Sequence, residues 1–104
     1  MSPVIRVSVL YPNSQGASFD LEYYLKTHLP MVRKTLGDAL LKDEAWKGLE
    51  APGDQPATYQ VVFHMFFDSP EAFGAAFGAH AESIMADIPK FTNVQPVVQL
   101  EAGV

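Results

Sequence analysis

The chain contains no cysteine, and this absence excludes three kinds of chemistry. Without a thiol there is no disulfide, no thiolate metal site and no cysteine nucleophile. Basic residues are also few: seven lysines and arginines stand against twelve aspartates and glutamates, giving a formal net charge of −5. No basic cluster is present, so neither a nucleic acid nor an anionic membrane surface is an expected partner.

The sequence also lacks long apolar runs. No stretch approaches the roughly 18 residues of a membrane span, and the N-terminal residues lack the charged region and long apolar core of a signal peptide. We therefore expect a cytoplasmic protein that contacts no membrane. Of the 104 residues, 48% are hydrophobic and 18% are charged. That composition is typical of a folded chain, and the length predicts one domain over residues 1–104.

Four segments have the pattern of β-strands. Residues 4–11 alternate between two sides, and residues 58–67 are rich in β-branched and aromatic side chains. Residues 39–50 have a weaker pattern that favours a partly exposed or edge strand. Residues 94–101 include Pro96, which cannot donate to a strand ladder, so this segment also belongs at an edge or a bulge.

A first helix is expected over residues 21–36. Asp20 or Ser18 can cap its start, and Gly37 can supply the left-handed residue at its end. Pro30 lacks an amide proton, so the helix is expected to bend beside His28. Its apolar stripe, with residues three and four apart, consists of Leu21, Tyr24, Leu25, His28, Leu29, Val32 and Leu36.

A second helix is expected from Pro70 to Ile88. Ser69 is placed to cap it, and Pro89 ends it. Gly74 and Gly78 fall within it and are expected to let the helix lie close to the sheet. Its stripe comprises Phe73, Ala76, Phe77, His80, Ile84 and Ile88.

The resulting order βαββαβ predicts an α+β, ferredoxin-like fold, in which two helices cover one face of a four-stranded antiparallel sheet. The other face is also rich in apolar side chains. It includes the predicted dimer-interface residues Val62, His64 and Phe66. The predicted strands and helices leave no further residues to cover this face, so we expect it to pack against the same face of a second copy in a homodimer. Scattered apolar residues are ordinary on protein surfaces, and this alternative stays open.

The segment FDLEYYLKTHLPMVRK (Phe19 to Lys34) resembles the helix signature of the EthD family, named for a link to ethyl tert-butyl ether degradation. FTNVQPVVQ (Phe91 to Gln99) resembles the last strand of that family. With the segment from Ser69 to Pro89, the likeness spans nearly the whole chain. The resemblance implies a dimeric α+β barrel of ferredoxin-like protomers. It does not fix the chemistry, because the superfamily includes monooxygenases, lactone isomerases and polyketide cyclases.

The residue pattern also limits the site. No two histidines have the spacing of a helical metal pair, and no glycine-rich loop follows a strand, so no metal and no cofactor are expected. His28 lies on the inward stripe of the first helix and is the candidate general base. Tyr24 or Tyr59 could donate to a developing oxyanion. A histidine on an apolar stripe can equally be structural, and both interpretations stay open. The expected ligand pocket contains Tyr59, Phe63, Phe73, Phe77 and His80.

Two functions are compatible with these features. The first is a protein that binds a small, largely apolar organic molecule and performs cofactor-free isomerase, cyclase or monooxygenase chemistry in xenobiotic or secondary-metabolite catabolism. The second is a non-catalytic accessory whose partner is a haem monooxygenase in ether degradation.

Overall fold

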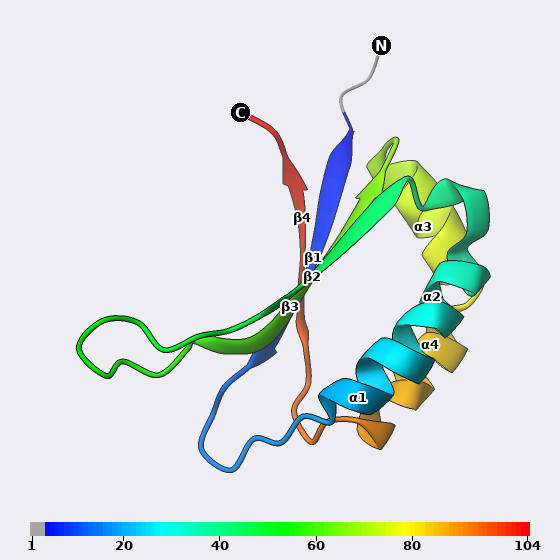
Figure 1. The fold of residues 1–104 in the computed structure, drawn as a ribbon. Helices are drawn as coiled ribbons and strands as arrows, with labels where there is room; N and C mark the ends of the chain where they lie inside the picture. The colour runs from blue at the N-terminus through cyan, green and yellow to red at the C-terminus, as the bar shows by residue number, and fades with distance from the viewer. Residues whose placement is uncertain (1–3) are drawn as a thin grey trace.

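The computed structural model describes residues 4–104 of the chain. Four strands, β1 (Ile5–Pro12), β2 (Lys42–Lys47), β3 (Tyr59–Phe67) and β4 (Val97–Ala102), form one sheet in the order β2-β3-β1-β4 (Figure 1). All neighbouring strands are antiparallel. The α+β, ferredoxin-like fold predicted from the sequence is therefore confirmed.

The two edge strands differ from their predicted extents. β2 is shorter than the predicted range 39–50, and it lies at an edge as expected. β4 begins at Val97 rather than at residue 94. The amide of Val94 donates to Oγ1 of Thr92 within a turn, and Pro96 has no amide, so pairing with β1 starts only after it.

The first helix is divided into three parts: α1 (Leu21–Tyr23), the π-helical turn η1 (Tyr24–His28) and α2 (Leu29–Leu36). Asp20 caps its start by accepting a hydrogen bond from the Tyr23 amide at 3.1 Å. The Leu29 amide bonds to the Tyr24 carbonyl, five residues back. Pro30 follows directly and cannot donate, so the irregularity lies where the sequence predicted one.

Gly37 ends α2 with a φ of +60°, which glycine adopts without a Cβ penalty. The chain then continues into the short 3-10 turn η2 (Gly37–Ala39).

The second helix is not continuous, contrary to the prediction. It consists of α3 (Pro70–Gly78) and α4 (Ala81–Asp87), followed by the 3-10 turn η3 (Ile88–Lys90). Ser69 caps α3 by accepting from the Ala72 amide at 3.0 Å, as expected. The chain leaves helical geometry at His80, whose φ and ψ are −131° and 9°.

The expectation for the two helical glycines was wrong. A Cβ atom on Gly74 or Gly78 would meet nothing within 4 Å, so neither glycine serves a close approach to the sheet.

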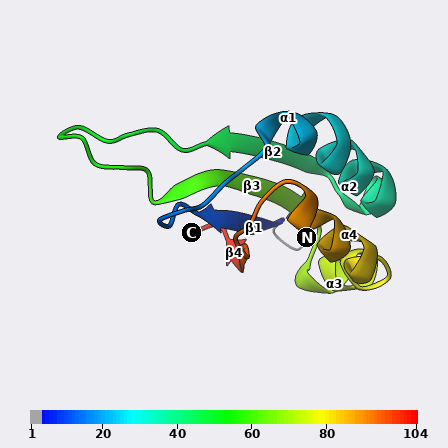
Figure 2. The ribbon, with the colours of Figure 1, turned by 90° about the horizontal axis from the view of Figure 1, so that it is seen from below.

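Both helical segments cover the same face of the sheet, which we call the inner face (Figure 1). Seen from below, α1 and α2 lie nearer β2, whereas α3 and α4 lie nearer β4 (Figure 2). Strand and helix side chains meet between the layers, where Val7 and Phe67 are 0% exposed. Burying each such side chain contributes about 1.5–3 kcal/mol to folding. Within residues 4–104, no helix combines the length and apolarity that crossing a bilayer requires.

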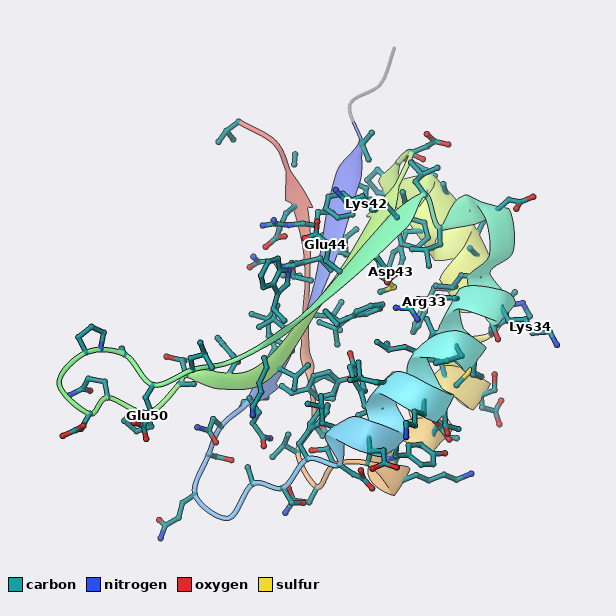
Figure 3. All side chains as sticks on the ribbon, viewed as in Figure 1. Arg33, Lys34, Lys42, Asp43, Glu44 and Glu50 are labelled. Carbon is teal, nitrogen blue, oxygen red and sulfur yellow. The ribbon has the colours of Figure 1, made fainter. Side chains whose placement is uncertain are left out.

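An ion pair joins α2 to the inner face at β2. Nη2 of Arg33 lies 2.8 Å from Oδ1 of Asp43, and Nε lies 3.0 Å from Oδ2, so the contact is bidentate. In Figure 3, Arg33 points from α2 towards Asp43, whereas the neighbouring Lys34 points away from the sheet. This ion pair connects the edge strand β2 to α2.

Candidate functional site

A cavity of about 350 Å³ lies between the inner face of the sheet and the helices. Met85 of α4 and Val98 of β4 line it and are about half exposed, so the cavity opens between these two elements. Most lining side chains are aliphatic or aromatic, and none is charged at neutral pH. Three of them carry a polar side-chain atom: Tyr11, Tyr24 and His28.

The imidazole of His28 is held by a carboxylate from the other helical segment. Nδ1 of His28 lies 2.8 Å from Oδ2 of Asp87, and the Tyr23 hydroxyl donates to Oδ1 of the same carboxylate at 2.8 Å. Lys90 Nζ lies 3.6 Å from Oδ1. Asp87 therefore connects the buried imidazole to groups nearer the surface.

This contact assigns the tautomer of His28. An ionised carboxylate only accepts hydrogen bonds, so Nδ1 carries the proton that is donated to Asp87. In the neutral ring, Nε2 is then the unprotonated nitrogen. Nε2 makes no hydrogen bond, and it is not among the buried, unpartnered polar atoms of residues 4–104. His28 lines the cavity and is only 3% exposed, so the accessible surface of Nε2 faces the cavity.

The environment keeps the imidazole neutral. Burial lowers the pKa of His28 below its usual value, and the hydrogen bond and charge of Asp87 offset only part of this effect. For Asp87, burial raises the pKa, but the hydrogen bonds from His28 and Tyr23 lower it by more. A neutral base thus lies beside an ionised carboxylate.

Tyr24 packs against His28 with its ring rather than presenting its hydroxyl. The two rings are stacked at 5.6 Å and 17°. Among residues 4–104, the Tyr24 hydroxyl oxygen is the one polar side-chain atom that is both buried and unpartnered. The Tyr11 phenol is a polar neighbour, but no hydrogen bond of acceptable geometry joins the two. The hydroxyl therefore does not reach the cavity surface as an oxyanion donor needs to.

The structure places three of the five expected pocket residues on the cavity lining: Phe63, Phe73 and Phe77. Tyr59 is not among them. The β1–β3 register shifts between Tyr11 and Pro12, so Tyr59 pairs with Pro12 at the end of the sheet. His80 is exposed, because the helix breaks at this residue and the spacing that placed it on the stripe no longer applies.

Sequence reasoning missed Asp87 and the site role of Tyr11. Asp87 follows Ile84 by three residues, so it was recognisable as a carboxylate beside the apolar stripe. Its partner His28 lies 59 residues away in the chain, and no local pattern signals the pairing. In residues 4–104, no group of three or more histidine, aspartate or glutamate side chains is arranged to hold a metal ion.

The predicted dimer residues Val62, His64 and Phe66 all lie on the outer face, opposite the helices, and are half-buried. Strand pairing aligns Trp46, Val62, Leu10 and Val97 in one apolar row across all four strands.

The neighbouring row is polar, which the sequence had not indicated. Ser8 donates to Oε1 of Glu101 at 2.6 Å, and its oxygen therefore accepts from Nδ1 of His64 at 2.8 Å. Arg6 and Gln99 also bond to Glu101.

Comparisons with known proteins agree with this fold. The model of the EthD domain matches residues 15–95. An EthD-like protein from Ralstonia eutropha JMP134 is 35% identical, with a TM-score of 0.91 over 98% of this chain and 93% of that one. An ethyl tert-butyl ether degradation (EthD) family protein from Bacillus halodurans C-125 is 17% identical, with a TM-score of 0.74 over 97% and 99% of the two chains.

A dimeric ferredoxin-like protein of unknown function from Thermobifida fusca YX shares the fold as well. It is 17% identical, with a TM-score of 0.67 over 99% of this chain and 93% of that one. No curated protein matches the chain. The fold defines an α+β protein of the ferredoxin-like class. Within that class, the chain belongs to the EthD family, as the resemblance in the sequence predicted.

Proposed function

We propose that this protein binds a small, largely apolar organic molecule in the cavity and that His28 acts on it as a general base. The observation that carries the proposal is the neutral imidazole, whose Nδ1 is held by Asp87 and whose Nε2 faces an uncharged cavity. A neutral ligand fits this lining, because a charged one would lose hydration without gaining a partner.

The chemistry would be a proton transfer. Nε2 of His28 takes a proton from an activated C–H group, and the electron pair of that bond remains on the ligand, where an adjacent acceptor group delocalises it. Asp87 stabilises the resulting imidazolium through the hydrogen bond to Nδ1, and Tyr23 fixes the carboxylate. Return of the proton to another atom gives an isomerisation. Attack of the carbanion on a carbonyl carbon of the same molecule, whose π pair moves to the oxygen and takes the proton back from His28, gives a cyclisation. Neither reaction requires a cofactor.

Deuterium exchange tests the proposal. The substrate is a compact carbon acid such as 1-tetralone, incubated with the protein in D₂O and followed by mass spectrometry. The wild type is expected to accelerate α-deuteration, and His28→Gln to reduce the rate by roughly 10²-fold or more. His80→Gln is the matched control, since His80 lies outside the cavity, and it should retain the wild-type rate.

The same experiment separates catalysis from an accessory role. Ligand binding without exchange in a panel of carbon acids would exclude His28 as a base and favour a non-catalytic partner of a monooxygenase. Absence of ligand binding in that panel would contradict the proposal as a whole.

We also propose that two copies pack through the outer faces of their sheets. The apolar row containing Trp46 and Val62 supports this arrangement, since Trp46 is 61% exposed in a single chain. The polar cluster formed by Ser8, His64 and Glu101 is internally hydrogen-bonded, so covering it leaves few unpaired groups.

A further inference from the structure

The phenol of Tyr11 is the second polar group with access to the cavity. Tyr11 directly precedes Pro12, the last residue of β1, lines the cavity and is 2% exposed. Its hydroxyl neighbours that of Tyr24 without a hydrogen bond of standard geometry, and the Tyr24 oxygen is the one polar side-chain atom of residues 4–104 that is both fully buried and unpartnered. The Tyr11 oxygen thus keeps accessible surface that the Tyr24 oxygen lacks.

Tyr11 and His28 are close in space, because both contact the same two aromatic rings. The ring of Tyr24 lies 5.8 Å from that of Tyr11 and 5.6 Å from that of His28. The ring of Phe91 lies 5.8 Å from Tyr11 and 4.5 Å from His28. The Tyr11 hydroxyl, a hydrogen-bond donor, and the His28 imidazole, a base, therefore line the same apolar cavity.

The two groups have complementary roles at neutral pH. Burial raises the pKa of the Tyr11 phenol, with a smaller opposing effect from the neighbouring Tyr24 hydroxyl, so the Tyr11 hydroxyl keeps its proton and is available as a donor. Nε2 of His28 has no proton and accepts. The lining offers no cation for a carboxylate or phosphate and no carboxylate for an amine.

We propose that the ligand is a neutral carbonyl compound whose oxygen accepts the hydrogen bond of Tyr11, with the adjacent C–H group directed towards Nε2 of His28. This inference rests on the proposed function and names its substrate class and its second polar residue. In the proton transfer, the C–H electron pair forms the C=C bond of an enolate. The carbonyl π pair moves to the oxygen, where Tyr11 stabilises the charge.

The test compares two ligands of nearly equal shape, 1-tetralone and its carbonyl-free analogue tetralin, by calorimetric titration. In the wild type, 1-tetralone is expected to bind more tightly. Tyr11→Phe is expected to weaken 1-tetralone binding roughly threefold to tenfold, the range of one neutral hydrogen bond, and to leave tetralin binding unchanged. Unchanged tetralin binding also shows that the variant is folded.

A spectroscopic measurement identifies the donor. Infrared difference spectra of carbonyl-¹³C-labelled 1-tetralone should show a lowered C=O stretching frequency in the wild type and in the control Tyr59→Phe, whose residue lies outside the cavity. The shift should be lost in Tyr11→Phe. Loss of the shift in Tyr24→Phe instead, or no shift in the wild type, would overturn the inference.

The outcomes distinguish the two proposals. If both ligands bind and Tyr11→Phe changes neither affinity nor frequency, the role of Tyr11 is wrong while the ligand cavity stands. If neither ligand binds the wild type, both proposals fail.

Discussion

Nδ1 of His28 lies 2.8 Å from Oδ2 of Asp87, and this contact joins the first helical segment to the second. Because the imidazole is buried and the carboxylate is partly exposed, the pair links the cavity to the surface. The contact also has a measurable effect on titration. We expect His28 to titrate below an exposed histidine in an NMR titration, with His28→Gln as the assignment control. In Asp87→Asn its pKa should fall further, because the carboxylate raises it.

The lowered pKa of His28 also predicts how stability depends on pH. Below its ordinary value of 6.5, the unfolded chain takes up the proton before the folded chain does. The contribution of His28 to the free energy of unfolding is therefore full above pH 6.5 and declines as pH falls towards the folded-state pKa. Urea unfolding of the wild type and of His28→Gln should show a stability difference that depends on pH in this range. A difference independent of pH would contradict the lowered pKa.

Glu101 predicts a second, more acidic transition. Hydrogen bonds from Ser8 and Arg6 lower its pKa from 4.5 to about 2 in the folded chain. Its stabilising effect is present above pH 4.5 and is lost as pH falls through about 2. The stability difference between the wild type and Glu101→Gln should therefore shrink as pH falls across this interval.

Val62 tests the proposed sheet-to-sheet dimer. Val62→Glu places a carboxylate in the apolar row, where burial without a partner costs several kcal/mol, so the dimer should dissociate. Phe66 is a poorer position, because Lys42 Nζ lies 4.9 Å from its ring centroid and could pair with the new charge. Sedimentation measures the mass, and Val62→Ile is the control. Trp46 fluorescence should shift to longer wavelength on dissociation. A wild-type protein that sediments as an 11.4 kDa monomer contradicts the proposal.

Gly48 is required by a close approach of two backbone segments. A Cβ atom at this position would overlap the carbonyl oxygen of Tyr59 and lie 2.8 Å from Cβ of Ala57. Gly48→Ala should therefore lower the free energy of unfolding by about 1–3 kcal/mol. Gly74→Ala is the matched substitution in open space, and it should stabilise α3 by up to about 1 kcal/mol. Thermal unfolding of both variants checks the opposite signs; equal effects would contradict the argument.

The Arg33–Asp43 ion pair should make only a small contribution to the free energy of unfolding. The Arg33 side chain is 45% exposed, so water screens the charges despite the bidentate geometry. A double-mutant cycle with Arg33→Met and Asp43→Ala is expected to give a coupling energy of about 0.2–1 kcal/mol that decreases with added salt. Lys34→Met, on the side of α2 that points away from the sheet, should have no coupling with Asp43→Ala.

Local patterns in the sequence determined most of the fold. Alternation in β1 and β3 and the caps at Asp20 and Ser69 act within a few residues, so the chain order and the α+β class follow from them. Pro30 likewise predicted an irregular turn beside His28, since a missing amide proton is a local property.

The site depended on contacts that no local pattern encodes. The break at His80 removed one predicted pocket residue, and another, Tyr59, lies at the end of β3 opposite Pro12, outside the cavity lining. The sequence placed His28 on an inward stripe, but only the packing of the two helical segments brought Asp87 to its Nδ1. Which of two neighbouring tyrosine hydroxyls keeps accessible surface was likewise decided by packing, because exposure depends on the atoms that surround a group and not on its position in the chain.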